Sequence, residues 1–137
     1  MFQKVVLAVD GSEYSARAVR VAADIAKKSD GEVLVFHVRE LTAARGGSYG
    51  MEDDAEAVAL VDQVRKQLAD AGVTTTGRVE PSLTGHAARA IIDTAEKEGA
   101  DAIVMGSRGL SDLGGLLLGS VTHKVIQLSH CTVVVAR

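Results

Sequence analysis

Continuous apolar runs alternate along the chain with segments in which apolar residues recur at helical spacing. The runs at 5–9, 33–38 and 102–105 are rich in β-branched residues, as is typical of strands buried on both faces. Two further strand-like segments span 73–79, which is more polar, and 133–136. Alternation of strands with helices predicts right-handed crossovers and a parallel sheet covered by helices on both faces.

The helical segments between these strands have recognisable ends. A residue suited to capping a helix N-terminus precedes each of the first three segments: Ser12, Asp53 or Asp54, and Thr84. Ser120 opens the last segment. A glycine follows each of the first three: Gly31, Gly72 and Gly99. We therefore expect three long helices and a short last one.

The polarity of the strands indicates their order. Strands one and four are the most apolar and belong in the centre, whereas the polar third strand suits an edge. The chain, residues 1–137, is thus predicted to form one Rossmann-like α/β domain, a doubly wound five-stranded parallel sheet in the order 3-2-1-4-5 with helices on both faces. Ligands of such sheets bind where the strand order reverses, here outside the carboxyl ends of strands one and four.

Composition restricts the classes of partner. The formal charge of -3 over 137 residues leaves no broad basic surface, so we expect no nucleic-acid binding. The opening apolar run is cut short by Asp10, too early for a signal-peptide core or a membrane span. One cysteine, Cys131, allows no internal disulfide. A cytoplasmic protein without membrane contact is the expectation.

A glycine-rich segment runs from the end of strand four to the last helix, at the predicted reversal point. Gly106, Gly109 and Gly119 permit tight turns and close approach of backbone N–H groups to phosphate. Ser120 adds a hydroxyl at a helix N-terminus, where the free N–H groups favour an anion. Across the gap, Asp10 ends strand one, where a carboxylate can accept ribose hydroxyls or help to hold a phosphate-bound metal ion. Asp10 could instead serve only as a capping residue beside Ser12.

The spacing Gly106-x2-Gly109-x9-Gly119-Ser120 resembles the nucleotide signature of the universal stress protein family, in its ATP-binding branch. Asp10, the His37-Val38 pair, the turn 105–109 and the valine-rich last strand extend the resemblance over the whole chain. One departure is His130-Cys131-Thr132, where many relatives have a proline before the last strand.

The resemblance implies ATP as ligand, with Mg or Mn as its metal, and assigns roles to individual residues. Ala8 and Val9 would form the wall under the base, which Val38 and Met105 would flank. Asp10 would bind the ribose or the metal ion. The phosphates would be held by Gly106, Gly109, Gly119, Ser120 and the backbone N–H of Val121. Arg108 either reaches phosphate or is a solvated loop residue.

The family is usually dimeric through its last strand. An apolar edge made by Val133, Val134 and Val135 invites pairing with a second copy, so we expect a homodimer. A regulatory role in the stress response follows from the resemblance.

Two other functions stay open. A slow ATPase or self-phosphorylating protein could use the Ser120 hydroxyl, although no G-x4-G-K-[ST] motif is present. A dimeric scaffold could keep the fold without binding nucleotide. The sequence 46–50 spells G-x-S-x-G around Ser48, but we expect it inside a flexible loop spanning 41–51, a flap over the nucleotide, and not on a nucleophile elbow. The four histidines show no metal-ligand spacing.

Overall fold

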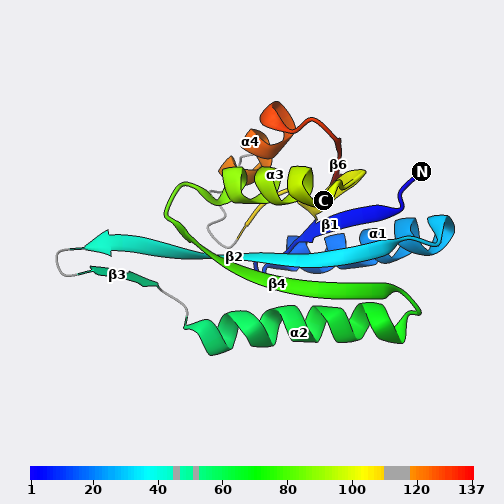
Figure 1. Cartoon of the computed structure of the whole chain (residues 1–137), viewed down its shortest axis with the longest axis horizontal. Helices are drawn as coiled ribbons and strands as arrows, with labels where there is room; N and C mark the ends of the chain where they lie inside the picture. Colours follow the sequence, from blue (N-terminus) through cyan, green and yellow to red (C-terminus); the bar gives the residue numbers. More distant parts are fainter. Residues whose placement is uncertain (45–46, 51–52, 110–117) are drawn as a thin grey trace.

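The computed structural model describes residues 1–44, 47–50, 53–109 and 118–137 of the chain (Figure 1). The strands are β1 (Lys4–Ala8), β2 (Glu32–Ala44), β3 (Gly47–Gly50), β4 (Thr74–Leu83), β5 (Ala102–Gly106) and β6 (Thr132–Ala136). The helices are α1 (Glu13–Ser29), α2 (Asp54–Asp70), α3 (Ala87–Glu98) and α4 (Ser120–Leu128). Gly46 and residues 110–117, which belong to the two glycine-rich segments, lie outside the described residues.

Five strands form a parallel sheet in the order β4-β2-β1-β5-β6. Counted along the chain without β3, this is the predicted order 3-2-1-4-5, which is confirmed. Figure 1 shows α1 and α2 on one face of the sheet and α3 and α4 on the other. The order reverses between β1 and β5, as the strand polarities indicated.

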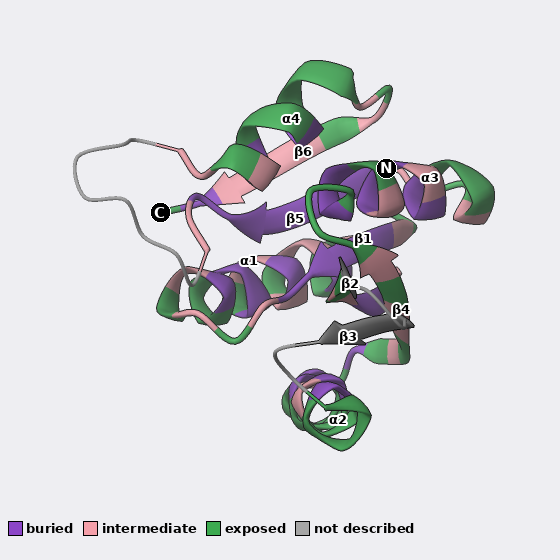
Figure 2. Cartoon of the chain, turned by 90° about the vertical axis from the view of Figure 1, so that its left-hand side faces the viewer, coloured by how far each residue is buried: buried purple, intermediate pink, exposed green. Residues whose placement is uncertain are grey.

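The apolar side chains form two cores, one on each face of the sheet. Successive residues of a strand point to opposite faces, so Val5 and Leu7 pack toward α1 and α2, whereas Val6 and Ala8 pack toward α3 and α4. Strands β1 and β5 are buried along nearly their whole length, as Figure 2 shows in purple. This double burial explains why these two strands read as unbroken apolar runs.

Strand β4 is the edge strand that its polarity predicted, but it is longer than expected. It continues past residue 79 to Leu83 and carries Pro81, which was expected just beyond the strand. Proline has no N–H for a sheet ladder and is tolerated at an edge, where one side of the strand needs no partner. Pro81 pairs in register with Arg39 of β2.

The expectation of a loop over 41–51 is wrong for the described part of that segment. β2 continues to Ala44, and β3 pairs back onto it in antiparallel register from Leu41↔Gly50 to Ala44↔Gly47. Leu41 pairs with Leu83 of β4 as well, so β3 occupies the other edge of β2, the edge on which β1 lies. The hairpin therefore extends the sheet beyond the carboxyl end of β1 (Figure 1). Ser48 lies within β3 and not on a strand-to-helix turn, which excludes a nucleophile elbow.

Two of the expected caps form. The hydroxyl of Ser12 accepts a hydrogen bond from the backbone N–H of Ser15 at 3.1 Å, and Asp53 caps α2 through the N–H of Glu56 at 2.7 Å. Thr84 does not cap α3. The N-cap position of that helix is His86, which makes no side-chain capping bond.

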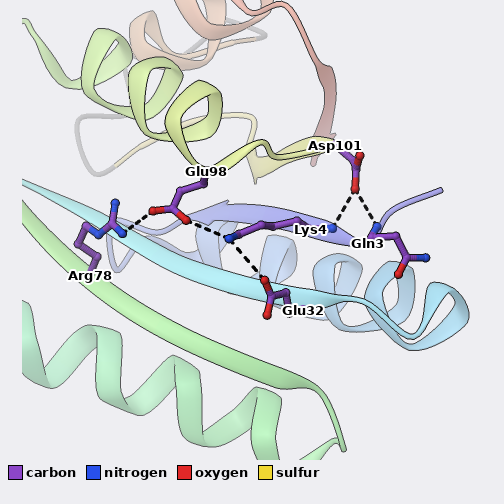
Figure 3. A network of polar contacts seen from close by, with 6 residues as sticks. All are labelled: Gln3, Lys4, Glu32, Arg78, Glu98 and Asp101. Carbon is purple, nitrogen blue, oxygen red and sulfur yellow. Dashed lines mark hydrogen bonds and ion pairs between the residues drawn. The ribbon is translucent and has the colours of Figure 1, made fainter.

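Ion pairs join three strands and a helix (Figure 3). Lys4 Nζ lies 2.9 Å from Glu98 Oε2 and 3.5 Å from Glu32 Oε1, and Arg78 Nη2 lies 2.6 Å from Glu98 Oε1. The backbone N–H groups of Gln3 and Lys4 donate to Asp101 Oδ2 at 2.8 and 2.9 Å. Charge-assisted bonds of this kind tie β1 to β2, β4 and α3 at the end opposite to the strand carboxyl ends.

Candidate functional site

A cavity of about 730 Å³ opens at the carboxyl ends of β1 and β5, where the strand order reverses. Its volume falls within the range of small-molecule sites. The chain segments that meet here are the ends of the central strands, the first turn of α4, the start of α3 and the outer part of β2. A parallel sheet brings these carboxyl ends together at one edge, which accounts for the position of the cavity.

All eleven residues predicted for the nucleotide site line this cavity. They are Ala8, Val9, Asp10, Val38, Met105, Gly106, Arg108, Gly109, Gly119, Ser120 and Val121. Their gathering in one place follows from the strand order. The part that each plays toward a ligand stays a prediction.

The cavity has an apolar side and a polar side. Ala8, Val38 and Met105 share the α3 face of the sheet and continue its apolar core to the cavity floor. Ala87 and Ile91 of α3 form an apolar wall. The polar side is built by Asp10, the Gly106–Gly109 turn and the first turn of α4. A flat apolar group can pack on the first part while a charged group meets the second.

Asp10 is held in the turn between β1 and α1. Its Oδ1 accepts the backbone N–H of Ser12 at 2.9 Å, and its own N–H donates to Ser15 Oγ at 3.2 Å. The second carboxylate oxygen, Oδ2, faces Gly109, where an added Cβ would lie 2.9 Å from it. Asp10 thus orders its own turn through one oxygen and faces the glycine turn with the other, so the capping interpretation accounts for only half of the carboxylate.

Gly106 is required for packing. A Cβ at this position would lie 2.6 Å from the backbone carbon of Tyr14 and 2.9 Å from the N atom of Ser15, in the first turn of α1. Glycine therefore allows α1 to begin directly against the end of β5. The guanidinium of Arg108 lies 5.6 Å from the centre of the Tyr14 ring, a cation–π contact on the same turn.

Hydrogen bonds fix the N-terminus of α4 against the end of β5. The N–H of Gly119 donates to the Ser107 carbonyl at 2.7 Å, and the N–H of Ser107 donates to the Ala136 carbonyl at 2.7 Å. The buried hydroxyl of Thr122 donates to the Gly106 carbonyl at 2.8 Å. Gly119 is the N-cap of α4, and the residues whose N–H groups have no partner within the helix line the cavity. Free N–H groups at a helix N-terminus favour an anion.

The buried His37 holds the backbone at the end of β1 in place from the β2 side of the cavity. Its Nδ1 lies 2.7 Å from the carbonyl oxygen of Val9, so Nδ1 carries the proton and donates to that oxygen. The bond ties β2 to the end of β1 just before Asp10. The sequence offered His37 only as part of the family resemblance, without this function.

Several lining residues escaped the sequence analysis. Glu40 and Thr42 follow Val38 at alternate positions of β2, and this signal was missed because the strand was expected to stop at 38. Lys124 stands one helical turn after Ser120. Thr84 also lines the cavity, although its position in the sequence favours a helix cap. Ala87 and Ile91 carry no local signal, since only the placement of α3 brings them to the cavity.

Metal-ligating side chains do not gather in the part of the chain that the structure describes, where no group of three or more His, Cys, Asp or Glu residues could hold an ion. A metal ion in the cavity would therefore have to share its ligands with a bound molecule. The carboxylates that line the cavity are those of Asp10 and Glu40. Within the described ranges, no helix combines the length and the apolar character needed to cross a membrane.

Fold and site together define a doubly wound α/β domain with a ligand cavity at its reversal point. The chain belongs to the universal stress protein family, whose model matches residues 1–137. It is 33% identical over 151 residues to the universal stress protein YxiE of Bacillus subtilis, with 100% of both chains covered.

Solved structures agree with this assignment. A universal stress protein from Archaeoglobus fulgidus superposes with a TM-score of 0.82 at 26% identity, covering 100% of each chain. A universal stress protein in complex with cAMP superposes with a TM-score of 0.74 at 27% identity, covering 98% of this chain and 97% of the other.

Proposed function

We propose that this protein binds an adenine nucleotide, with ATP as its principal ligand, in the cavity at the strand carboxyl ends. The observation that supports this most directly is the shape of that cavity, in which an apolar floor adjoins a glycine turn and a helix N-terminus. The cAMP complex of a related universal stress protein supports the same class of ligand. ATP has both a flat base for the apolar floor and charged phosphates for the polar side of the cavity.

The residues present fit a nucleoside polyphosphate. The base would lie on Ala8, Val38 and Met105, against the apolar wall of α3. The ribose would meet Asp10, whose Oδ2 faces the glycine turn. The phosphates would lie between Gly109 and the first N–H groups of α4, where a Cβ in place of the glycine hydrogen would narrow the space.

A positive charge in the cavity favours several phosphates over one. Lys124 lines the cavity from the second turn of α4 and, among the described residues, has no hydrogen-bond or ion-pair partner. Side chains on a helix lean toward its N-terminus, which directs the Lys124 ammonium back to Ser120. The β- and γ-phosphates of ATP would meet this charge beyond the backbone N–H groups.

We further propose that the protein is a homodimer and serves as a nucleotide-responsive regulator in the stress response. Strand β6 is the sheet edge opposite to β4, and Val133, Val134 and Val135 are each only half-buried in the single chain. Pairing of two β6 strands across a two-fold axis would satisfy the free edge and cover these side chains.

Calorimetric titration of nucleotide-free protein with ATP and magnesium tests the binding. We expect a dissociation constant below ~100 μM, about -5.5 kcal/mol, for the native chain. Gly109→Val should abolish the heat, because its side chain would displace the Asp10 carboxylate and fill the phosphate space. Ala69→Val, an exposed change on α2 of the same chemical kind, should bind as the native chain does. Absence of both heat and a thermal shift up to ~1 mM ATP would refute the proposal and favour a scaffold without ligand.

A further inference from the structure

The cavity follows the α3 face of β2 outward past the nucleotide residues predicted from the sequence. Side chains alternate along a strand, and Leu34, Phe36 and Val38 all pack on this face. Glu40 and Thr42 continue the same alternation and also line the cavity. The lining thus changes from apolar to polar along β2, in the part of the strand that projects toward β3 (Figure 1).

This polar end lies across the cavity from the phosphate side. β1 separates β2 from β5, so the two ends stand roughly two strand spacings, about 10 Å, apart. Arg108 and Lys124 carry positive charge near the glycine turn and α4, whereas Glu40 carries negative charge at the β2 end. A ligand with phosphates at one end would place its uncharged, distal edge near Glu40.

The polar side chains at the outer end of β2 can accept hydrogen bonds from a ligand but have no hydrogen left to donate. The Thr84 hydroxyl donates to the Leu41 carbonyl at 3.2 Å, so its one hydrogen is used. Thr42 Oγ1 lies 3.3 Å from Thr84 Oγ1, and its hydrogen therefore goes to Thr84. Among the described residues, Glu40 has no hydrogen-bond or ion-pair partner, and an ionised carboxylate only accepts. Glu40, Thr42 and Thr84 form an acceptor cluster that presents oxygen lone pairs and no free hydrogen.

We infer that the acceptor cluster selects the base, with Glu40 accepting a hydrogen bond from the exocyclic amino group of a 6-aminopurine. The inference rests on the proposed nucleotide site. A 6-oxopurine would place a carbonyl oxygen against the carboxylate, where acceptor faces acceptor. Glu40, Thr42 and Thr84 are exposed in the ligand-free chain, so the discrimination depends on the base covering the Glu40 carboxylate. An acceptor that loses solvent without gaining an N–H group then costs free energy, which disfavours the 6-oxopurine. Loss of one charge-assisted bond corresponds to a preference of about 10-fold or more.

The test compares ATP with inosine triphosphate, which carries an oxygen at C6. Calorimetric titration of the native chain should give an affinity for ATP about 10-fold or more above that for inosine triphosphate. In Glu40→Gln the amide can donate as well as accept, so the preference should fall to about 3-fold or less. Thr42→Val should weaken the binding of ATP and of inosine triphosphate by similar factors. These factors should be smaller than the effect of Glu40→Gln, because Glu40 remains in place.

Asp70→Asn is the matched control, since it removes the same charge at an exposed position at the end of α2. It should keep the native preference. Tight ATP binding with no preference over inosine triphosphate, or with a preference unchanged in Glu40→Gln, would overturn the role of Glu40 and leave the nucleotide site intact. Failure of the native chain to bind either nucleotide would overturn the proposed function itself and the selectivity with it.

Discussion

The close approach of α1 to Gly106 leads to a quantitative prediction. In Gly106→Ala the new Cβ would lie 2.6 Å from the backbone carbon of Tyr14, whereas ordinary contacts begin at 3.4 Å. The first turn of α1 would therefore have to retreat by about 0.8 Å, the difference between these two distances. Backbone cannot rotate aside as a side chain can, so the cost should resemble that of overpacking a core, about 1–3 kcal/mol.

The expected change in melting temperature follows from the size of the chain. An unfolding entropy of about 2.1 cal/mol/K per residue, over 137 residues, amounts to about 0.29 kcal/mol/K. Gly106→Ala should therefore melt about 3–10 °C below the native chain. Differential scanning calorimetry and urea unfolding of the ligand-free protein provide the measurement.

Gly119→Ala is the companion variant. Its Cβ would lie no closer than 3.3 Å, to the Cα of Arg108, and the residue has φ -71° and ψ 162°, which alanine adopts without strain. The free energy of unfolding should change by less than about 1 kcal/mol. Equal destabilisation by the two variants, or a change below about 0.5 kcal/mol for Gly106→Ala, would refute the packing role of Gly106.

Three other variants probe the cavity, the amino-end ion pairs and the free edge. Lys124→Gln should weaken ATP binding about 3- to 10-fold and leave AMP binding nearly unchanged in the same calorimetric titration; equal losses for both nucleotides would contradict a role at the outer phosphates. The hydrogen bond from Arg78, followed by that from Lys4, lowers the pKa of Glu98 below its ordinary value of 4.5. Its stabilisation is thus fully present above pH 4.5 and is lost as the pH falls through the lowered pKa, so Glu98→Gln should be less stable than the native chain near neutrality and match it in strong acid, as measured by urea unfolding. Val135→Lys should convert a dimer into a monomer in light scattering at micromolar concentration, because two ammonium groups would meet across the two-fold axis; a native chain that is already monomeric there would exclude the β6 dimer.

The central part of the fold could be predicted because its strands are buried on both faces. Such strands appear in the sequence as uninterrupted apolar runs. Their polarity alone placed β1 and β5 in the centre of the sheet and β4 at its edge. The strand ends could not be predicted in the same way. Glycine at 47 and 50 and proline at 81 are local signals for turns, yet pairing between residues more than 40 positions apart, such as Leu41 and Leu83, extends both β2 and β4.

The candidate site shows the same division. Its glycines, Asp10 and the apolar floor could be located because parallel strands bring their carboxyl ends to one edge whatever the loops between them do. The places of Glu40 and Thr42 in the site could not be predicted, because they depend on how far β2 extends. The place of Thr84 depends on which of two hydrogen bonds its hydroxyl makes. Thr84 satisfies the carbonyl of Leu41 on the neighbouring strand and not the N-terminus of its own helix. Competition of this kind between local and distant partners is decided by tertiary structure.

The glycines of the signature do not carry equal weight as evidence for a nucleotide. Gly106 would be needed by any chain in which α1 begins against the end of β5, because its absent Cβ makes room for backbone of the same fold. Gly109 faces a carboxylate at the rim of the cavity, where a side chain could be accommodated by moving Asp10. A scaffold without ligand would therefore still require glycine at position 106 but not at position 109. It follows that a variant at 106 measures the fold and a variant at 109 measures the site, and only the second separates the nucleotide-binding protein from the scaffold.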